Sequence, residues 1–300
     1  MDFIIGGLAG AGASAFTTPM DVVKTRLQLQ GELQSSSETK TKYRGTFHAM
    51  YVIVMKDGIK GLQKGLAPAL ILGFVVNSVR LGIYHIAEVH GWTKNKNGDI
   101  SVDKAIFWSG IGGLLGGIIC NPLLVIRTRL QSNAHPSIAV GRQYKYNGLC
   151  DGFIKIFKSE GIKGFVAGIS VTGPRVAIGS ATQLTTFSKA KEMLLSHGMC
   201  NSSPFALAFA ASAVSGIVIV LTVCPIDVAA IRLYNQGPAQ NGKLLYTGIV
   251  DCITKIYRTE GLHGLYKGVG PLYLKLAPHT TISLVIWDVL NNFLQRNKTS

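Results

Sequence analysis

Eight basic residues stand inside or at the ends of apolar stretches of this 300-residue chain, where an unpaired charge is costly. They are Lys24, Arg26, Arg80, Arg127, Arg129, Arg175, Arg232 and Lys275. Ionisable groups in such surroundings face protein or water rather than lipid, and they commonly mark a substrate path. Guanidinium and ammonium groups pair well with carboxylates and oxyanions, so the set directs attention to anion binding.

Three of these residues, Arg80, Arg175 and Lys275, lie several turns from the ends of their stretches. From there a side chain cannot easily reach a headgroup layer, so we predict that the three line a pocket. We expect no deep acid to neutralise them, which would make a positive well that concentrates small anions. The two arginines can also bind carboxylates through two parallel hydrogen bonds.

The elements that must position these residues are six weakly polar stretches, near residues 1–30, 66–90, 103–131, 169–190, 204–234 and 271–294. Each is longer than the about 20 helical residues that cross a bilayer core. A mean hydropathy of +0.30 with 15% charged residues is also too apolar for an ordinary soluble chain. We therefore predict an all-α membrane protein with six transmembrane helices.

The net charge of +15 does not indicate nucleic-acid binding, because the basic residues follow the six stretches. Fifteen lie in the loops after the first, third and fifth stretches, and seven lie on the opposite side. This bias puts the three long loops on the inner face and both termini outside. We expect no cleaved secretory signal, and the five cysteines show no metal-ligand spacing.

A repeat of about 100 residues is the strongest pattern in the chain. Similar segments begin at prolines spaced by 103 residues, at 19–28, 122–131 and 225–234, and each is followed by a Tyr-x-Gly and then an acid-Gly pair. Each repeat predicts a proline-kinked helix, an inner amphipathic helix (around 46–56, 149–158 and 249–258) and a second spanning helix. The predicted repeat boundaries are 1–98, 99–200 and 201–300.

These motifs resemble the threefold signature of the mitochondrial carrier family over nearly the whole chain. The resemblance implies a multi-pass transporter of the mitochondrial inner membrane with pseudo-threefold symmetry and both termini on the intermembrane-space side. It implies no enzymatic activity and no cofactor, and we expect a monomer. The sequences around Arg80, Tyr234 and Lys275 are similar to the keto-acid and dicarboxylate branch, including the oxaloacetate/sulfate carriers and members 34 and 35 of solute carrier family 25.

Departures from the family signature predict how the inner gate is built. If three repeats ring an axis, Asp21 can pair with Arg127, and Asp227 can pair with Lys24. The third pair would join Leu124 to a position held by alanine, so both charged partners are missing at one contact. Losing one partner leaves a poorly solvated charge, whereas losing both leaves an apolar contact of little cost.

The third gate contact is therefore Leu124 against Ala230. The family's bracing glutamines correspond to Gln28 and Gln131, and Tyr234 replaces the third. The family's outer gate survives only as fragments, in which Lys191 and Asp288 can form one cross-helix ion pair. A weaker outer gate predicts an empty carrier that rests open to the outside.

The resemblance implies exchange of small organic anions by alternating access. Dicarboxylates and keto acids such as oxaloacetate or malate are expected, with sulfate or phosphoenolpyruvate as further candidates. The implied contact points are Arg80, Arg175 and Lys275, and the weaker candidates for selectivity are Asn77, Gln183 and His279.

The family also binds structural cardiolipin where its Tyr-x-Gly loops meet the starts of its even-numbered helices. Backbone N–H groups at helix N-termini suit phosphate groups. The candidate positions are Gly45, Gly65, Gly148, Gly168, Gly248 and Gly268. Their alternative interpretation is as simple turn glycines.

Two other functions stay open within the same fold. A nucleotide or cofactor carrier also needs cations, but Arg175-Val176 lacks the Gly-aliphatic pair typical of adenine binding in the family. A proton-leak or uncoupling-type protein would fit the degenerate gates, and strict counter-exchange would separate it from a carrier. An enzyme is disfavoured because the sequence offers no nucleophile–base arrangement and no metal cluster.

Overall fold

The computed structural model describes residues 2–34, 42–93, 101–196, 204–238 and 244–299, which form an all-helical chain. The first repeat holds α1 (Asp2–Leu29), α2 (Thr46–Asp57), the 3-10 helix η1 (Ile59–Gln63) and α3 (Leu66–Val89). The second holds α4 (Val102–Ile119), α5 (Asn121–Ser132), the 3-10 helix η2 (Pro136–Ile138), α6 (Leu149–Glu160), α7 (Ile162–Phe165) and α8 (Ile169–Ser196). The third holds α9 (Pro204–Asn235), α10 (Ile249–Leu265) and α11 (Val269–Thr299).

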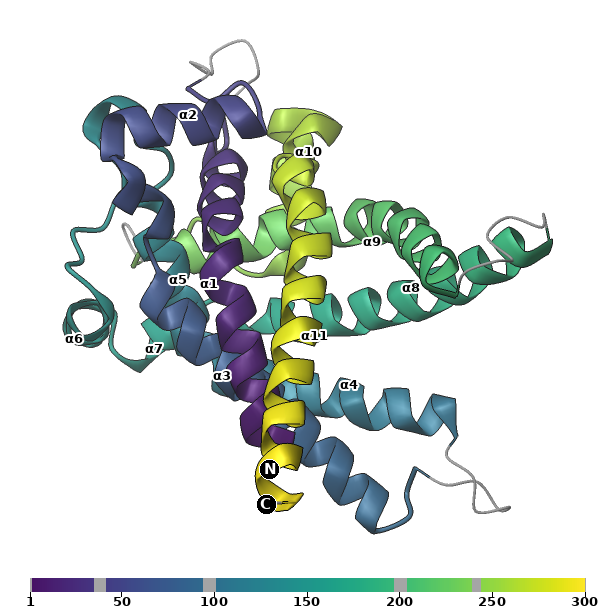
Figure 1. The fold of residues 1–300 in the computed structure, drawn as a ribbon. Helices are drawn as coiled ribbons and strands as arrows, with labels where there is room; N and C mark the ends of the chain where they lie inside the picture. The colour runs from purple at the N-terminus through teal and green to yellow at the C-terminus, as the bar shows by residue number, and fades with distance from the viewer. Residues whose placement is uncertain (1, 35–41, 94–100, 197–203, 239–243, 300) are drawn as a thin grey trace.

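The long helices close into a ring. Contacts run from α1 to α3, α3 to α4, α4 to α8, α8 to α9 and α9 to α11, and α11 returns to α1. Both termini lie at one end of the molecule, and α2 and α10 lie at the other (Figure 1). Both termini at one end agree with an even number of membrane crossings per chain.

Glycines let neighbouring helices of the ring approach closely. A Cβ added at Gly73 of α3 would lie 2.8 Å from the carbonyl oxygen of Gly10 in α1. A Cβ added at Gly112 of α4 would lie 2.8 Å from Cα of Arg80 in α3. Close backbone contact of this kind is how helices associate in lipid, where no hydrophobic drive holds them together.

The three prolines of the repeat act differently from one another. Helices α1 and α9 continue through Pro19 and Pro225. The second repeat breaks instead, with α4 and α5 inclined by 62°, and Pro122 lies in the first turn of α5. A proline there needs no N–H partner, and the bend of 62° just before Pro122 agrees with the prediction of a helix interrupted at proline.

Two segments of the described chain are long and apolar enough to cross a membrane, Ile59–Val89 and Ala213–Asn235. The bent pair Phe107–Ile119 and Asn121–Ser132 would make a third if it forms one span. Helices α1, α8 and α11 have 28, 28 and 31 residues, but they carry polar and charged residues that lower their hydropathy. Six spans therefore remain a prediction, resting on helix length and the closed ring.

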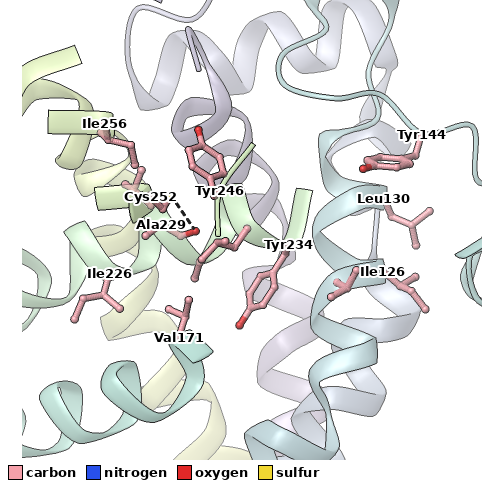
Figure 2. Close-up of a cluster of buried hydrophobic side chains, with 14 of the residues drawn as sticks. Ile126, Leu130, Tyr144, Val171, Ile226, Ala229, Tyr234, Tyr246, Cys252 and Ile256 are labelled. Carbon is pink, nitrogen blue, oxygen red and sulfur yellow. Dashed lines mark hydrogen bonds between the residues drawn. The ribbon is translucent and has the colours of Figure 1, made fainter. Parts of the chain in front are cut away.

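The three predicted inner helices are present as α2, α6 and α10. Each buries one isoleucine completely, and these three, Ile53, Ile156 and Ile256, each pack on a glycine just beyond the following turn. A core cluster joins the inner ends of the second and third repeats, including Ile126, Val171, Ala229, Tyr234 and Cys252. Figure 2 shows Tyr234 in this cluster and the Cys252 thiol donating to the carbonyl oxygen of Ala229, 3.9 Å away.

Replacing Ile156 with alanine is expected to destabilise the protein by about 2–5 kcal/mol, because the side chain is fully buried against its neighbours. The matched control is Ile154→Ala on the same helix, where the side chain is 54% exposed. Thermal unfolding in detergent can be followed with a thiol-reactive dye, since Cys120, Cys224 and Cys252 are buried in the folded state. Equal losses in the two variants would contradict the assigned inner face of α6.

Candidate functional site

Two ion pairs join the inner ends of the three repeats. Lys24 Nζ of α1 lies 2.6 Å from Asp227 Oδ2 of α9, and both side chains are buried. Arg127 of α5 forms an ion pair with Asp21 of α1. These are the two ion pairs predicted from the acids and bases of the signature if the three repeats ring an axis.

The same two carboxylates also bind cations from two further helices of the ring, α8 and α11. Arg175 Nε of α8 lies 2.9 Å from Asp227 Oδ1, and Lys275 Nζ of α11 lies 2.7 Å from Asp21 Oδ1. The expectation that no acid would neutralise the deep cations was therefore wrong for these two. Each aspartate has two oxygens, and each oxygen serves a base from a different helix.

Arg80 is the exception among the three deep cations. Its Nη2 donates to Asn77 Oδ1 at 3.1 Å, and among the described residues it makes no ion pair. His279 lies within electrostatic range of Arg80, Lys275, Arg127 and Asp21. The side chains of Gln183, Lys191 and Asp288 fall outside the described residues, so the outer pair stays a prediction.

The site carries an excess of positive charge. Its two carboxylates, Asp21 and Asp227, are shared by four cations, and Arg80 adds a fifth. An anion with two or more negative charges would complement this excess. Buried ions that lose one partner are strongly destabilised, so displacing a cation from either aspartate requires a compensating partner.

The third contact of the ring is apolar, as the sequence suggests. Ala230 is buried in the core cluster at the inner ends of the second and third repeats, and Leu124 packs against that cluster. The brace residues lie against glycines of a neighbouring repeat: Gln131 against Gly65, Tyr234 against Gly168 and Gln28 against Gly268. Thr25 Oγ1 donates to Gln131 Oε1 at 2.9 Å, which ties that brace to α1.

The structure adds a second ring of charges that the sequence analysis did not assign to the site. Arg26, Arg129 and Arg232 are buried, and each binds an acid of its own repeat, respectively Asp57, Glu160 and Glu260. Arg129 does so as a fork, with Nη1 and Nη2 lying 2.5 and 2.8 Å from the two oxygens of Glu160.

Each of these arginines also reaches the next repeat around the ring. Nε of Arg26 donates to the carbonyl oxygen of Gln131, that of Arg129 to Tyr234, and that of Arg232 to Gln28, at 3.1, 3.1 and 3.2 Å. The carbonyls are those of the brace positions. In the sequence, this ring is indicated by two features that occur in all three repeats: the arginine near the end of each proline segment, and the acid of the acid-Gly pair.

Lysines strengthen this ring in two of the three repeats. Lys64 Nζ lies 3.3 Å from Asp57 Oδ2 and donates to the carbonyl oxygen of Asn133 at 2.8 Å. Lys267 Nζ lies 2.6 Å from Glu260 Oε2 and donates to the carbonyl oxygen of Gln30 at 2.7 Å. The second repeat has Ala167 at this position, so Glu160 has no lysine there.

The acids of this ring lie outside the long helices and show the effect of their partners. Burial alone would raise the pKa of Asp57, but the hydrogen bond and charge of Arg26 outweigh it, and the pKa is lowered. At Glu260 burial is likewise outweighed by Arg232 and Lys267, and the pKa is lowered. Both carboxyls are therefore held in the charged form.

The six candidate lipid glycines fall into two geometric classes. Gly45, Gly148 and Gly248 are extended residues immediately before α2, α6 and α10, with open space around them and no side-chain cap on those helices. Gly65, Gly168 and Gly268 have left-handed backbone and contact the brace residues. The second class has a packing role, whereas the first leaves backbone N–H groups accessible to a phosphate.

Comparison of the sequence with known proteins identifies a family and several relatives. Residues 1–93, 99–198 and 201–298 each match the family described as mitochondrial carrier protein. Solute carrier family 25 member 35 of Mus musculus is 43% identical over 294 residues, covering 98% of each chain. The mitochondrial oxaloacetate transport protein of Saccharomyces cerevisiae is 37% identical (95% of this chain, 87% of the relative), and the mitochondrial citrate transporter E of Aspergillus niger is 35% identical (98% and 93%).

Replacing Ala167 with lysine is expected to raise the stability of the protein by about 1 kcal/mol, because a lysine there can reach Glu160 as Lys267 reaches Glu260. Val166→Lys, at the neighbouring exposed position, controls for added charge. The unfolding temperature of each purified variant measures the effect. If the two variants shift it equally, the second repeat does not use the same geometry as the third.

Proposed function

Since the chain belongs to the mitochondrial carrier family, we propose that it exchanges small organic anions with two or more carboxylates across the mitochondrial inner membrane. Family membership makes it a multi-pass transporter of that membrane and not an enzyme. The finer statements, the class of anion and exchange by alternating access, are the proposal. The orientation with both termini in the intermembrane space belongs to it as well and rests on the positive-inside bias.

One observation carries the proposal, namely that Asp21 and Asp227 are each shared between two cations. Lys24 and Arg127 belong to the inner gate, whereas Arg175 and Lys275 are the deep cations expected to contact substrate. An incoming dianion competes with the aspartates for Arg175 and Lys275. Once these leave, each aspartate keeps only its gate partner, so anion binding weakens the inner closure at two contacts.

Arg80 supplies the first contact for the anion. It is the deep cation that no described carboxylate neutralises, so an anion binds it without first displacing an acid. From there a second anionic group can displace Asp227 or Asp21 from its cation. A monoanion occupies Arg80 alone and leaves the shared aspartates intact, so a second negative group is needed to unlock the gate.

The inner pairs hold the empty carrier closed on the inner side. Removing one partner of a buried pair costs roughly 3–5 kcal/mol, so opening needs compensation from the bound anion. Arginine and lysine from α3, α8 and α11 together supply it, because these helices surround the axis in the closed ring. Alternating access then couples anion movement to the gate.

The relatives support a polycarboxylate rather than a nucleotide. The two named by substrate carry oxaloacetate and citrate according to their names, and both molecules bear at least two carboxylates. A nucleotide carrier and a proton-leak protein remain the competing functions, and the transport assay below separates them. Structural cardiolipin at Gly45, Gly148 and Gly248 is also part of the proposal, supported by the open helix starts there.

Uptake into liposomes containing purified protein tests the proposed substrate class. Labelled oxaloacetate, malate, sulfate, phosphoenolpyruvate and ATP are offered to liposomes preloaded with the same anion or left empty. Small dicarboxylates should enter preloaded liposomes only. Arg80→Ala and Arg175→Ala should each lower uptake about 10- to 100-fold, since each removes a charged hydrogen bond to the anion. Arg258→Ala on the exposed face of α10 should not.

Uptake of ATP alone would overturn the polycarboxylate assignment. Anion uptake into empty liposomes at the preloaded rate would overturn exchange and favour a leak. Either result leaves the family assignment intact.

A charge swap tests the sharing of Asp227. Lys24→Asp or Asp227→Lys alone should abolish transport, because each leaves like charges at a buried contact. The double variant restores the pair, but it leaves Arg175 facing the introduced lysine, so its unfolding temperature should stay below wild type. Adding Arg175→Gln should recover part of that stability. A double variant as stable as wild type would show that Arg175 does not share Asp227.

A further inference from the structure

The loop between α5 and α6 crosses from one repeat to the other two. We call residues 133–146 the strap; it contains η2 and leads to Tyr146 at the start of the inner-helix motif. The second repeat, to which the strap belongs, holds the strap against the end of α5. Gln143 Nε2 donates to the carbonyl oxygen of Ser132 at 3.0 Å, and the guanidinium of Arg129 lies 4.5 Å above the ring of Tyr144. The strap therefore leaves the end of α5 and returns to it.

The middle of the strap is bound to the first repeat. Tyr43 Oη donates to the carbonyl oxygen of Ile138 at 2.8 Å, and Lys42 Nζ donates to that of Ala139 at 2.5 Å. The backbone N–H of His135 donates to Asp57 Oδ1 at 2.9 Å. Ile138 is buried in a cluster that also contains Tyr43.

The strap is also bound to the third repeat. Tyr144 Oη donates to the carbonyl oxygen of Asn235, the last residue of α9, at 2.8 Å. Ile231 of α9 belongs to the same buried cluster as Ile138 and Val140. The strap thus contacts all three repeats at their inner ends.

Gly141 lies where the strap crosses the ends of α1 and α9. Gly141 has a left-handed φ of 61°, and a Cβ there would lie 3.1 Å from Leu29 Cβ of α1 and 2.8 Å from Asn235 Nδ2 of α9. Glycine is needed at this position for both its backbone conformation and its lack of a side chain. The strap therefore passes directly over the place where the ends of α1 and α9 meet.

We propose that the strap is an inner-side latch that holds the empty carrier closed. This inference rests on the proposed alternating access, in which the inner ends of α1, α5 and α9 separate. A short segment anchored at the end of α5 cannot keep its bonds to Tyr43 and Asn235 while these ends move apart. Opening therefore requires the strap to release at least one neighbouring repeat.

The latch acts beside the gate contact whose own positions carry no charge. At those positions the second and third repeats meet through Leu124 and Ala230. Ala167 stands where Lys64 and Lys267 bind their acids in the other repeats, which leaves the pair of Arg175 with Asp227 as the salt bridge described between these two repeats. The bond from Tyr144 to Asn235 links these same two repeats. The strap thereby adds a polar contact beside the gate positions that lost their charges.

Cysteine labelling tests the latch without transport. In a background with the five cysteines replaced by serine, Ala230→Cys places a single thiol at the buried apolar contact. A membrane-impermeant maleimide applied from the inner side labels it when that side opens. Lys42→Met with Tyr43→Phe removes two bonds to the strap and should speed labelling about tenfold, from two hydrogen bonds of ordinary net strength.

The matched control is Lys56→Met with Tyr51→Phe, which removes the same groups from the exposed side of α2. It should leave the labelling rate unchanged. Equal rates in wild type, control and strap variant would overturn the latch. Faster labelling in the control as well would assign the effect to general loosening of α2 and would also overturn it.

A disulfide gives the opposite test, and the reduced form of the same variant controls for the strain that a side chain introduces at Gly141. Leu29→Cys with Gly141→Cys places two Cβ atoms about 3.1 Å apart, close to the 3.5–4.5 Å of a disulfide. Oxidation should slow labelling at position 230 at least tenfold, read by peptide mass spectrometry, and reduction should restore it. Unchanged labelling in the oxidised protein would overturn the latch. Neither test uses a substrate, so a wrong anion assignment would leave both results valid.

Discussion

Two buried carboxylates hold the centre of this protein together. Asp21 and Asp227 each accept one base from the inner gate and one from a helix that is expected to contact substrate. A carboxylate buried without a cation would be prohibitively costly, and one shared by two cations lets either partner leave without that cost. In the proposed cycle the arrangement makes the gate responsive to an anion, because the anion competes with the two aspartates for Arg175 and Lys275. The positions of α1, α5, α8, α9 and α11 all have to satisfy these two residues.

A second ring of arginines ties the helix ends of neighbouring repeats to one another. Arg26, Arg129 and Arg232 bind an acid of their own repeat and a backbone carbonyl of the next. Since the carbonyls lie at the brace positions, each repeat end is fixed by its neighbour. This explains why the brace residues lie against glycines, because a larger side chain at Gly65, Gly168 or Gly268 would push the braces away.

The sequence predicts the repeat, the inner helices and the two gate pairs because each leaves a pattern along the chain. The joint loss of charge at Leu124 and Ala230 even indicates which residues face each other. The sharing of Asp21 and Asp227 left no such pattern, since it depends on how α8 and α11 are rotated toward the axis. The arginine ring was overlooked for the opposite reason: it occurs in every repeat, so no departure drew attention to it. The break at Cys120, by contrast, lies beside Pro122, where the sequence predicts an interruption, and Asn121 Nδ2 donates to the carbonyl oxygen of Phe165 there.

The three repeats share a fold, but the contacts between them are unequal. The contacts of the first repeat with the second and third each carry a gate ion pair and a lysine that binds an acid of the arginine ring. Between the second and third repeats the gate positions are apolar and Ala167 replaces the lysine, so the pair of Arg175 with Asp227, the apolar contact and the strap close that side. In the proposed cycle an anion competes for Arg175 and Lys275, whose ion pairs join the third repeat to the second and to the first, whereas an apolar contact does not respond to an anion. In that cycle the second and third repeats separate only after Arg175 has left Asp227 and the strap has released. Pseudo-symmetry therefore describes how the ring is built, and the loss of one charged gate contact makes the three faces of the ring unequal.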